Sequence, residues 1–289
     1  MAHKINHFLL LICFLPALAG CFNTTVDTRP IKNPDDQRAE KPSVAVIHEE
    51  TAALRANEIN TSHWIHLNRP ARIPILMYHS ISKGNNSLHV PEQDFQAEMK
   101  WIKDHGYVTL TPAEAYLVLT RDIKPGKKCV LITLDDGYRD SYRTAYPIFR
   151  KYGLHATIFM IGKKIGAHNH LTISEMMEMT KHGISIQSHT INHQDLTLLS
   201  PGRQKAEMAL SKALFDQMFT QETLSLSYPF GRYDSETLKL ARETGYKMAV
   251  TTKPGAASRI QGMFALHRIR ISPGISLTRF GTLLDRANQ

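Results

Sequence analysis

The chain has 289 residues, of which 42% are hydrophobic and 21% are charged. This composition excludes a wholly disordered protein and supplies enough apolar residues for one large domain or two small ones. Thirty-five Lys and Arg residues against 26 Asp and Glu residues give a formal net charge of +9, which by itself selects no partner. Three cysteines are too few for a disulfide framework or for a structural zinc site built on cysteine.

The N-terminus has the pattern of an export signal. Lys4 precedes an apolar run over residues 8–18, which is shorter than the roughly 20 residues that a membrane-spanning helix needs. The run ends in Leu-Ala-Gly-Cys at residues 18–21, which resembles the lipobox of bacterial lipoproteins. We expect a signal peptide over residues 1–20 and an exported protein with a lipid anchor at Cys21. An ordinary secretory signal is the alternative.

Residues 22–70 are polar, are interrupted by Pro30, Pro34 and Pro42, and show no sustained apolar period. Such a segment is typical of a flexible tether, which we place at residues 21–70, with the folded domain at residues 71–289. Residues 1–20 contain one charged residue, Lys4, so their removal lowers the formal net charge to +8. For an exported protein, this charge favours an anionic envelope over nucleic acid as the surroundings.

From residue 73 onward, apolar runs of strand length alternate with segments of helical character. The strand-like runs are 73–78, 129–134, 156–161, 184–186, 224–227 and 248–251, and the helical segments are 91–105, 113–120, 142–152, 173–182, 201–219 and 235–245. This alternation indicates βα units around a parallel sheet. No Gly-rich phosphate loop follows the first run, so we predict an α/β fold, a distorted (β/α) barrel of about seven units in a single catalytic domain.

Active sites of parallel α/β folds lie at the carboxyl ends of the strands, where polar residues follow the apolar runs. These residues are His79, Asp135, Asp136, Tyr138, His189, His193, Tyr228, Phe230 and His267. Each is weak evidence alone, because histidine pairs at a spacing of four are expected by chance in a chain with 15 histidines. Their shared position at strand ends is what singles them out.

Two imidazoles and one carboxylate form a natural site for a divalent metal with positions open for water and substrate. A second, adjacent carboxylate can then take a proton from the attacking water, which suggests metal-assisted hydrolysis. Two alternatives remain open for Asp135 and Asp136: helix capping, or, with the two histidines, a non-haem iron oxygenase site.

These residues resemble the motifs of the polysaccharide deacetylases of carbohydrate esterase family four, over roughly residues 70–272. Residues 133–137 (TLDDG) look like the first motif, and residues 188–193 (SHTINH) look like the second. The resemblance implies that Asp135 is the catalytic base and that Asp136, His189 and His193 hold the metal. Zinc is the metal that the family commonly uses, with cobalt or nickel also accepted.

The later motifs depart from the family pattern. In residues 226–231 (LSYPFG), Ser227 stands where the family has an arginine that orients the base. Arg232 is a candidate substitute, and a surface arginine without this role is the alternative. The backbone N–H of Phe230 is expected to help stabilise the oxyanion. His267, after Leu266, is the nearest match to the family's general acid, and a packing role is its alternative.

The phrases around residues 74–79, 135–140 and 146–152 resemble the intercellular-adhesin branch, which acts on poly-β-1,6-N-acetylglucosamine. The resemblance implies an N-deacetylase of this biofilm polymer at the cell surface. We also expect no nucleic-acid partner and a monomer. His79 is expected to contact the sugar, and a buried histidine satisfied by the backbone is its alternative. Tyr138 and Tyr228 offer rings for stacking, with ordinary packing as the alternative. Peptidoglycan, chitin oligomers or acetylated xylan are alternative substrates, and a non-catalytic surface polysaccharide-binding protein is an alternative of another class.

Overall fold

The computed structural model describes residues 59–289, which form one compact unit. The predicted signal peptide, Cys21 and most of the predicted tether lie outside the described residues. Within residues 59–289, no helix combines the length and the apolar character that crossing a bilayer requires.

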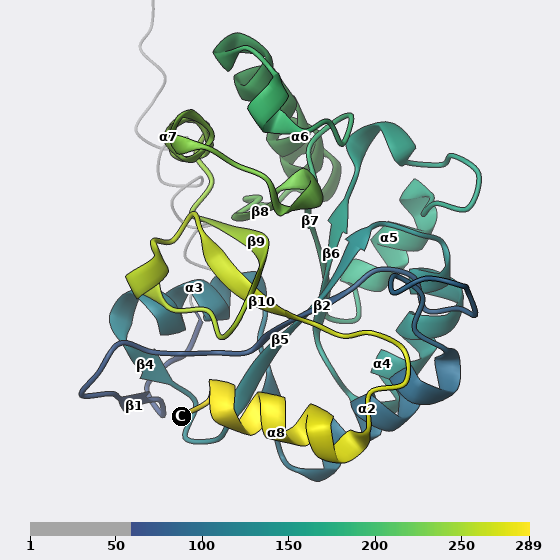
Figure 1. Ribbon diagram of the computed structural model, residues 1–289, viewed down its shortest axis with the longest axis vertical. Helices are drawn as coiled ribbons and strands as arrows, with labels where there is room; N and C mark the ends of the chain where they lie inside the picture. The colour runs from purple at the N-terminus through teal and green to yellow at the C-terminus, as the bar shows by residue number, and fades with distance from the viewer. Residues whose placement is uncertain (1–58) are drawn as a thin grey trace, which may run out of the picture. The chain divides into compact units, whose positions relative to one another are not determined.

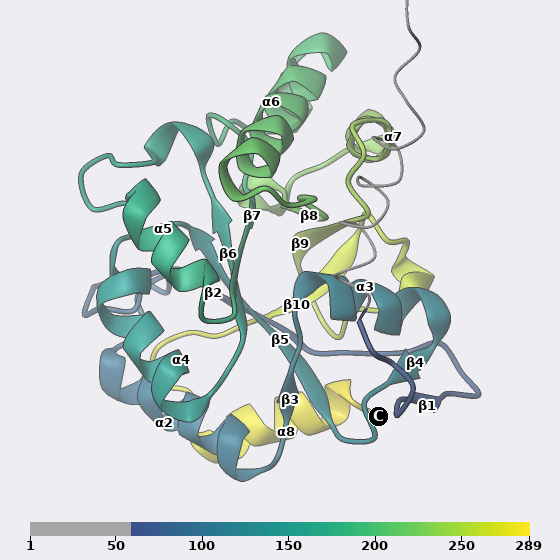
Figure 2. The ribbon, with the colours of Figure 1, turned by 180° about the vertical axis from the view of Figure 1, so that it is seen from behind.

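Seven parallel strands close into a ring, seen from opposite sides in Figure 1 and Figure 2. They are β2 (Ile75–Tyr78), β5 (Cys129–Asp136), β6 (Ala156–Met160), β7 (Ile184–Ser188), β8 (Ser225–Ser227), β9 (Met248–Pro254) and β10 (Leu266–Arg270). Their order is β2-β10-β9-β8-β7-β6-β5, and pairing of β2 with β5 completes the ring. A further strand, β3 (Val108–Thr109), pairs with β5. The predicted barrel of about seven units is therefore confirmed.

Helices follow the strands, as the alternating pattern predicts. They are α2 (Glu92–Asp104), α3 (Pro112–Arg121), α4 (Tyr146–Tyr152), α5 (Ile173–Thr180), α6 (Pro201–Phe219), α7 (Ser235–Glu243) and α8 (Leu277–Ala287). A π-helical turn, η1 (Ser141–Ala145), leads into α4. Gly153 ends α4 with a φ of 65°, the left-handed conformation that glycine adopts at low cost.

The last strand and helix were not among the predicted elements. β10 reads LHRIR, so its three basic side chains hide the apolar run that marks the other strands. The amphipathic pattern of α8, which buries Phe280 and Leu284, was available in the sequence and was missed.

Ordered structure begins before the predicted domain boundary at residue 71. The short strand β1 (Ile65–His66) pairs antiparallel with β4 (Ile123–Lys124), and the backbone N–H of Leu67 donates to the carbonyl of Asp122. The side chains of Trp64 and Leu67 also pack against the core. The predicted tether therefore extends too far toward the C-terminus, because a two-residue strand leaves no periodicity in the sequence.

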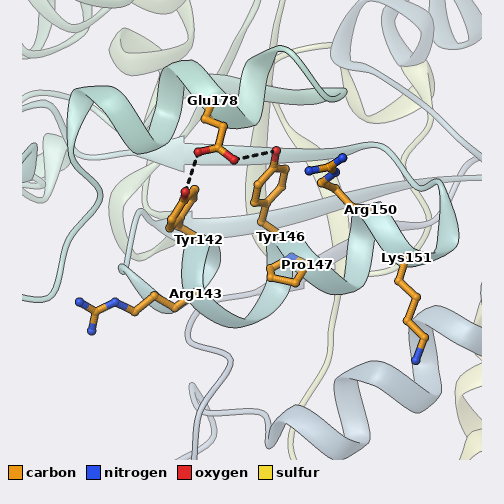
Figure 3. Close-up of a pocket in the computed structure, with 7 residues that line it drawn as sticks. All are labelled: Tyr142, Arg143, Tyr146, Pro147, Arg150, Lys151 and Glu178. Carbon is orange, nitrogen blue, oxygen red and sulfur yellow. Dashed lines mark hydrogen bonds between the residues drawn. The ribbon is translucent and has the colours of Figure 1, made fainter.

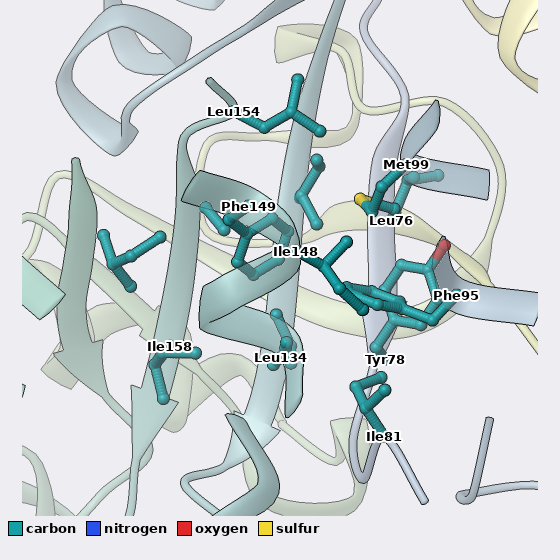
Figure 4. Close-up of a cluster of buried hydrophobic side chains, with 14 of the residues drawn as sticks. Leu76, Tyr78, Ile81, Phe95, Met99, Leu134, Ile148, Phe149, Leu154 and Ile158 are labelled. Carbon is teal, nitrogen blue, oxygen red and sulfur yellow. The ribbon is translucent and has the colours of Figure 1, made fainter. Parts of the chain in front are cut away.

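The core between the ring and helices α2 and α4 supports the start of the catalytic face. In Figure 4, Tyr78 at the end of β2 lies beside Phe95 of α2, close to Phe149 of α4. The Tyr78 and Phe95 rings meet edge to face at 5.2 Å, and the Phe95 and Phe149 rings at 5.4 Å. This packing fixes the carboxyl end of β2, from which His79 emerges.

Candidate active site

The structure brings together the three predicted metal ligands, which come from the carboxyl ends of two strands on either side of β6. Asp136 ends β5, and His189 and His193 follow β7. Asp136 Oδ1 lies 3.4 Å from His189 Nε2 and 3.5 Å from His193 Nε2. One ligand atom from each residue lies within 4.8 Å of the others. The prediction that these side chains meet at the carboxyl ends of the strands is therefore right.

Unusual backbone conformations turn these side chains toward one another. Asp136 has a φ of 71° and His193 a φ of 57°, both in the left-handed region that few non-glycine residues occupy. Gly137 has a φ of 75°, and a Cβ there would lie 1.9 Å from the sulfur of Met160. The glycine of the TLDDG motif is thus required by both conformation and space.

Hydrogen bonds behind the cluster hold both histidines in place. Nδ1 of His189 lies 2.7 Å from the carbonyl oxygen of Ser227, so Nδ1–H donates to it and Nε2 keeps its lone pair for a metal. Glu207 of α6 accepts from Asn192 twice, from the backbone N–H at 2.8 Å and from the side-chain amide at 2.5 Å. Because Asn192 directly precedes His193, this pair anchors the loop that carries the second histidine.

The donor set and its spacing fit a divalent cation. Ligand atoms bound at roughly 2.0–2.2 Å to a tetrahedral metal lie about 3.3–3.6 Å from one another, and the two measured separations from Asp136 fall in this range. Two imidazoles and one carboxylate leave room for water and substrate, as catalytic sites do. The residues present therefore suit a metal such as zinc, cobalt or nickel, although a donor set of this kind does not select one of them.

Beside the cluster, Asp135 is held by a buried arginine that the sequence analysis did not assign. Arg268 of β10 donates from Nη1 to Asp135 Oδ1 at 2.8 Å and from Nη2 to Oδ2 at 2.6 Å. Its Nε donates to the carbonyl of Thr251 at 2.8 Å. Arg268 is fully buried, and every contact fixes the plane of its guanidinium. Arg268 thus orients the carboxylate of Asp135.

This contact accounts for the departure at residue 227. Ser227 Oγ lies 3.3 Å from Asp135 Oδ2 and 3.1 Å from Arg268 Nη2, so the serine joins the same network. Arg232 does not replace the missing arginine, because it pairs with Asp195 at 2.6 Å on the surface, with 65% of its side chain exposed. The arginine is supplied instead by another strand, directly after His267. The signal that could have revealed Arg268 is a charged residue in a strand, on the face of that strand that points into the barrel.

The charges of the site set the protonation of Asp135 and its neighbours. Burial alone raises the pKa of Asp135, but the Arg268 guanidinium outweighs it and holds that pKa well below its usual range. Burial lowers the pKa of His79, and the charges of Asp135 and Asp136 act against that lowering. Asp135 is therefore ionised at neutral pH and can accept a proton, and a neutral His79 lies close to both carboxylates.

The remaining predicted residues divide into two groups. Phe230 and Tyr138 lie at the site, together with His79. Phe230 is 58% exposed, and its ring meets the His193 ring edge to face at 4.7 Å. Burial raises the pKa of the Tyr138 hydroxyl, and the negative charge of Asp136 raises it further. These side chains are available to a substrate in contact with the cluster.

Two predicted residues do not belong to the site. The expectation that Tyr228 offers a ring to sugar is wrong, because its side chain is fully buried and its hydroxyl donates to the carbonyl of Phe264 at 3.0 Å. His267 precedes Arg268 in β10 and lies on the opposite face of the strand, against Gly255 and near Lys253. The structure therefore does not bring His267 to Asp135, and its assignment as general acid is not supported.

Comparisons with known proteins agree with this geometry. The family model for polysaccharide deacetylase matches residues 122–249. YxkH of Bacillus subtilis strain 168, named as a candidate polysaccharide deacetylase, is 55% identical over 282 residues, 97% of each chain. The structure of the Streptococcus pyogenes deacetylase PplD in complex with acetate is 40% identical, with a TM-score of 0.73 over 75% of this chain and 99% of that one.

The name of a more distant relative specifies its substrate. The poly-β-1,6-N-acetyl-D-glucosamine N-deacetylase of Staphylococcus aureus strain MSSA476 is 27% identical over 286 residues, 93% of each chain. The extensive similarity to YxkH shows that the chain belongs to the polysaccharide deacetylase family. The protein is thus an enzyme whose substrate is an acetylated polysaccharide.

Proposed function

We propose that the protein removes N-acetyl groups from poly-β-1,6-N-acetylglucosamine. The observation that carries the chemistry is the adjacency of an ionised carboxylate, Asp135, to the cluster of Asp136, His189 and His193. The choice of polymer is supported by the similarity to the Staphylococcus aureus enzyme along 93% of both chains. Similarity to YxkH favours no particular glycan, so the polymer must be tested directly.

The reaction hydrolyses an acetamide, giving acetate and a free amine. A divalent cation on Asp136, His189 and His193, for which we propose zinc, supplies Lewis acidity toward the acetamide carbonyl and toward water. Asp135 accepts the proton of the attacking water through the carboxylate that Arg268 orients. The low pKa of Asp135 means that it readily passes this proton on.

Two further groups complete the reaction. The backbone N–H of Phe230 donates to the oxygen that becomes negative when the carbonyl is attacked. The departing nitrogen needs a proton, and His79 is the imidazole near Asp135 and Asp136 that is not a predicted metal ligand. We assign His79, in place of His267, the relay of that proton: the neutral imidazole accepts the proton that Asp135 took from water and donates it to the amine nitrogen.

We also propose that the enzyme acts outside the cell, anchored by lipid at Cys21, because residues 1–21 carry the lipobox pattern. A Cys21→Ala variant expressed in a bacterial host should lose its lipid modification and its membrane fraction. Retention of the lipid in that variant would refute the anchor and leave the catalytic proposal untouched.

The catalytic proposal is tested by acetate release from matched oligomers. Purified protein with added zinc or cobalt is assayed on β-1,6-linked N-acetylglucosamine, chitin oligomers, peptidoglycan and acetylated xylan. We expect the β-1,6-linked oligomer to be hydrolysed fastest and Asp135→Asn to abolish release. Faster hydrolysis of another glycan would reassign the substrate. Binding without acetate release by the wild type would favour a polysaccharide-binding protein.

A further inference from the structure

A pocket of about 400 Å³ lies between β10, α8 and the segment at the end of β9. We call it the arginine pocket. It is lined by Arg72, Pro254, Gly255, Ala256, Ile269, Arg270, Arg279, Leu283, Arg286 and Ala287. The predicted metal ligands and Asp135 are not part of this lining. The pocket thus has a lining of its own, although the charge of its Arg270 also acts on His79 of the active site, and its volume is within the range of ligand pockets.

Its four arginines come from three parts of the chain: Arg72 precedes β2, Arg270 ends β10, and Arg279 and Arg286 belong to α8. All four are exposed. Within residues 59–289 none of them forms a salt bridge, whereas Arg139, Arg232, Arg259 and Arg268 all do. The lining also contains no Asp or Glu. One sign of charge therefore surrounds the pocket, which concentrates its field on an incoming anion.

Another basic pocket does not have a lining of one charge sign. The pocket of about 580 Å³ on η1, α4 and α5 holds Arg143, Arg150 and Lys151, but also Glu178. Figure 3 shows Glu178 between the two tyrosines, accepting from Tyr142 at 2.6 Å and from Tyr146 at 3.5 Å. A carboxylate at this position repels anions. The arginine pocket has no equivalent among its lining residues.

The lining also indicates the shape of the ligand. Arg279, Leu283 and Arg286 share one face of α8, and the two arginines are about 10 Å apart along the helix axis. Ile269 and Ala287, both buried to more than nine-tenths, supply apolar surface to the same pocket. Charged groups separated along an apolar surface suit a chain that carries several anions linked by carbon-bearing units. They suit a single small ion less well.

Arginines that approach from several directions favour phosphate over carboxylate. A carboxylate presents two coplanar oxygens, which a single guanidinium fork can satisfy. A phosphodiester presents two anionic and two ester oxygens in a tetrahedral arrangement, so its acceptors are not confined to one plane and guanidinium groups can approach from more than one direction. From this lining we propose that the arginine pocket binds a phosphodiester-linked polymer through its phosphate groups. The concave form favours a single chain over the flat surface of an anionic membrane.

The test is equilibrium binding of the full-length protein to an end-labelled glycerol phosphate oligomer, measured by fluorescence polarisation at two salt concentrations. We compare Arg279→Gln/Arg286→Gln with Arg121→Gln/Arg203→Gln. The second pair removes the same charge from exposed arginines outside the pocket. We expect the pocket pair to weaken binding about tenfold or more and to reduce its salt dependence, and the control pair to weaken it less than about twofold.

Three other outcomes would overturn the proposal or assign the pocket to another ligand. Equal losses in the two pairs would show general charge attraction and overturn the proposal. Equally tight, pocket-dependent binding of polygalacturonate would overturn the preference for phosphate. Pocket-dependent binding of phosphatidylglycerol vesicles without binding of the oligomer would assign the pocket to a membrane instead. Binding is measured without turnover, so failure of the proposed deacetylation and failure of this site remain distinguishable.

Discussion

Asp135 and Arg268, 133 residues apart in the sequence, form a buried ion pair with two hydrogen bonds. Arg268 reaches Asp135 from β10, and Ser227 occupies the position of the arginine in the family motif. Because the contact places one guanidinium nitrogen on each carboxylate oxygen, it sets both the orientation of Asp135 and its charge. The structure thus keeps the chemistry of the motif while changing the strand that supplies it.

Replacement of Arg268 by lysine should impair the reaction more than the binding of substrate. Lysine keeps the positive charge but cannot hold both oxygens of Asp135, so the base loses its orientation. We expect kcat to fall about 100-fold or more with little change in KM. Steady-state kinetics of Arg268→Lys test this, together with thermal melting of Arg268→Ala, in which loss of one partner of the buried pair costs about 3–5 kcal/mol of stability.

A second variant separates positioning from stability. In Ser227→Arg/Arg268→Ala, the arginine returns to the motif position, beside Asp135. We expect this double variant to recover a large part of the activity that Arg268→Ala loses. Arg232→Gln serves as the control, because Arg232 pairs only with Asp195 on the surface. A large loss in Arg232→Gln, or full activity in Arg268→Lys, would contradict the assigned role.

Histidine variants test which imidazole transfers the proton to the amine. His79 lies near both aspartates, and His267 lies against Gly255 on the other face of β10. We expect His79→Gln to lower kcat by about 10²–10⁴-fold, the usual effect of losing a general acid. His267→Gln should stay within about threefold of the wild type. The reverse order in acetate release assays would restore the original assignment of His267.

The sequence was sufficient to predict the barrel and the ligand cluster. Six strands are apolar runs, and the residues after them are brought together because parallel strands end at one edge. Local patterns could therefore place Asp136 beside His189 and His193. The motif glycine Gly137 is likewise explained by a local conformation.

What could not be predicted depends on packing between distant segments. Arg268 differs from a surface arginine only in the direction of its side chain, which the closure of β10 against β2 determines. Tyr228 follows a strand as His79 does, but packing around it buries its ring. Alternation within a strand places His267 opposite Arg268, and β10 was not predicted as a strand. A linear motif contains no information about these orientations.

Removal of the carboxylate of Glu207 should weaken metal binding without removing a ligand. Glu207 holds the backbone and the side chain of Asn192, which directly precedes His193. Loss of such an outer contact typically costs 10–100-fold in metal affinity. We expect Glu207→Ala to bind zinc that much more weakly in a competition titration with a chelator. Glu243→Ala, on the surface of α7, is the matched control, and equal affinities in the two variants would contradict this role.

Glu98 makes the stability of the protein depend on pH. Its carboxyl is buried in α2 behind the active-site strand, where it accepts from the Tyr78 hydroxyl at 2.8 Å. Its other oxygen is buried and has no hydrogen-bond partner among residues 59–289. Burial raises the pKa of Glu98 from its ordinary value near 4.5 to about 8. The folded protein therefore keeps a proton that the unfolded chain releases.

The sign of the effect follows from this difference in bound protons. Below about pH 4.5 both states are protonated at Glu98, so the group adds no pH dependence to the free energy of unfolding. Between about pH 4.5 and 8 only the unfolded state releases its proton, and stability falls as pH rises, by on the order of 1.4 kcal/mol per pH unit. Above about pH 8 the contribution of Glu98 levels off, because both states are ionised.

Glu98→Gln should remove this slope, since glutamine does not titrate and can still accept from Tyr78. We expect the variant to gain stability over the wild type progressively from pH 5 to pH 8, in urea unfolding curves at several pH values. Glu92→Gln changes an exposed carboxyl of the same helix and should leave the slope unchanged. A wild-type slope that persists in Glu98→Gln would show that the pH dependence has another origin, because no other group differs between the two proteins.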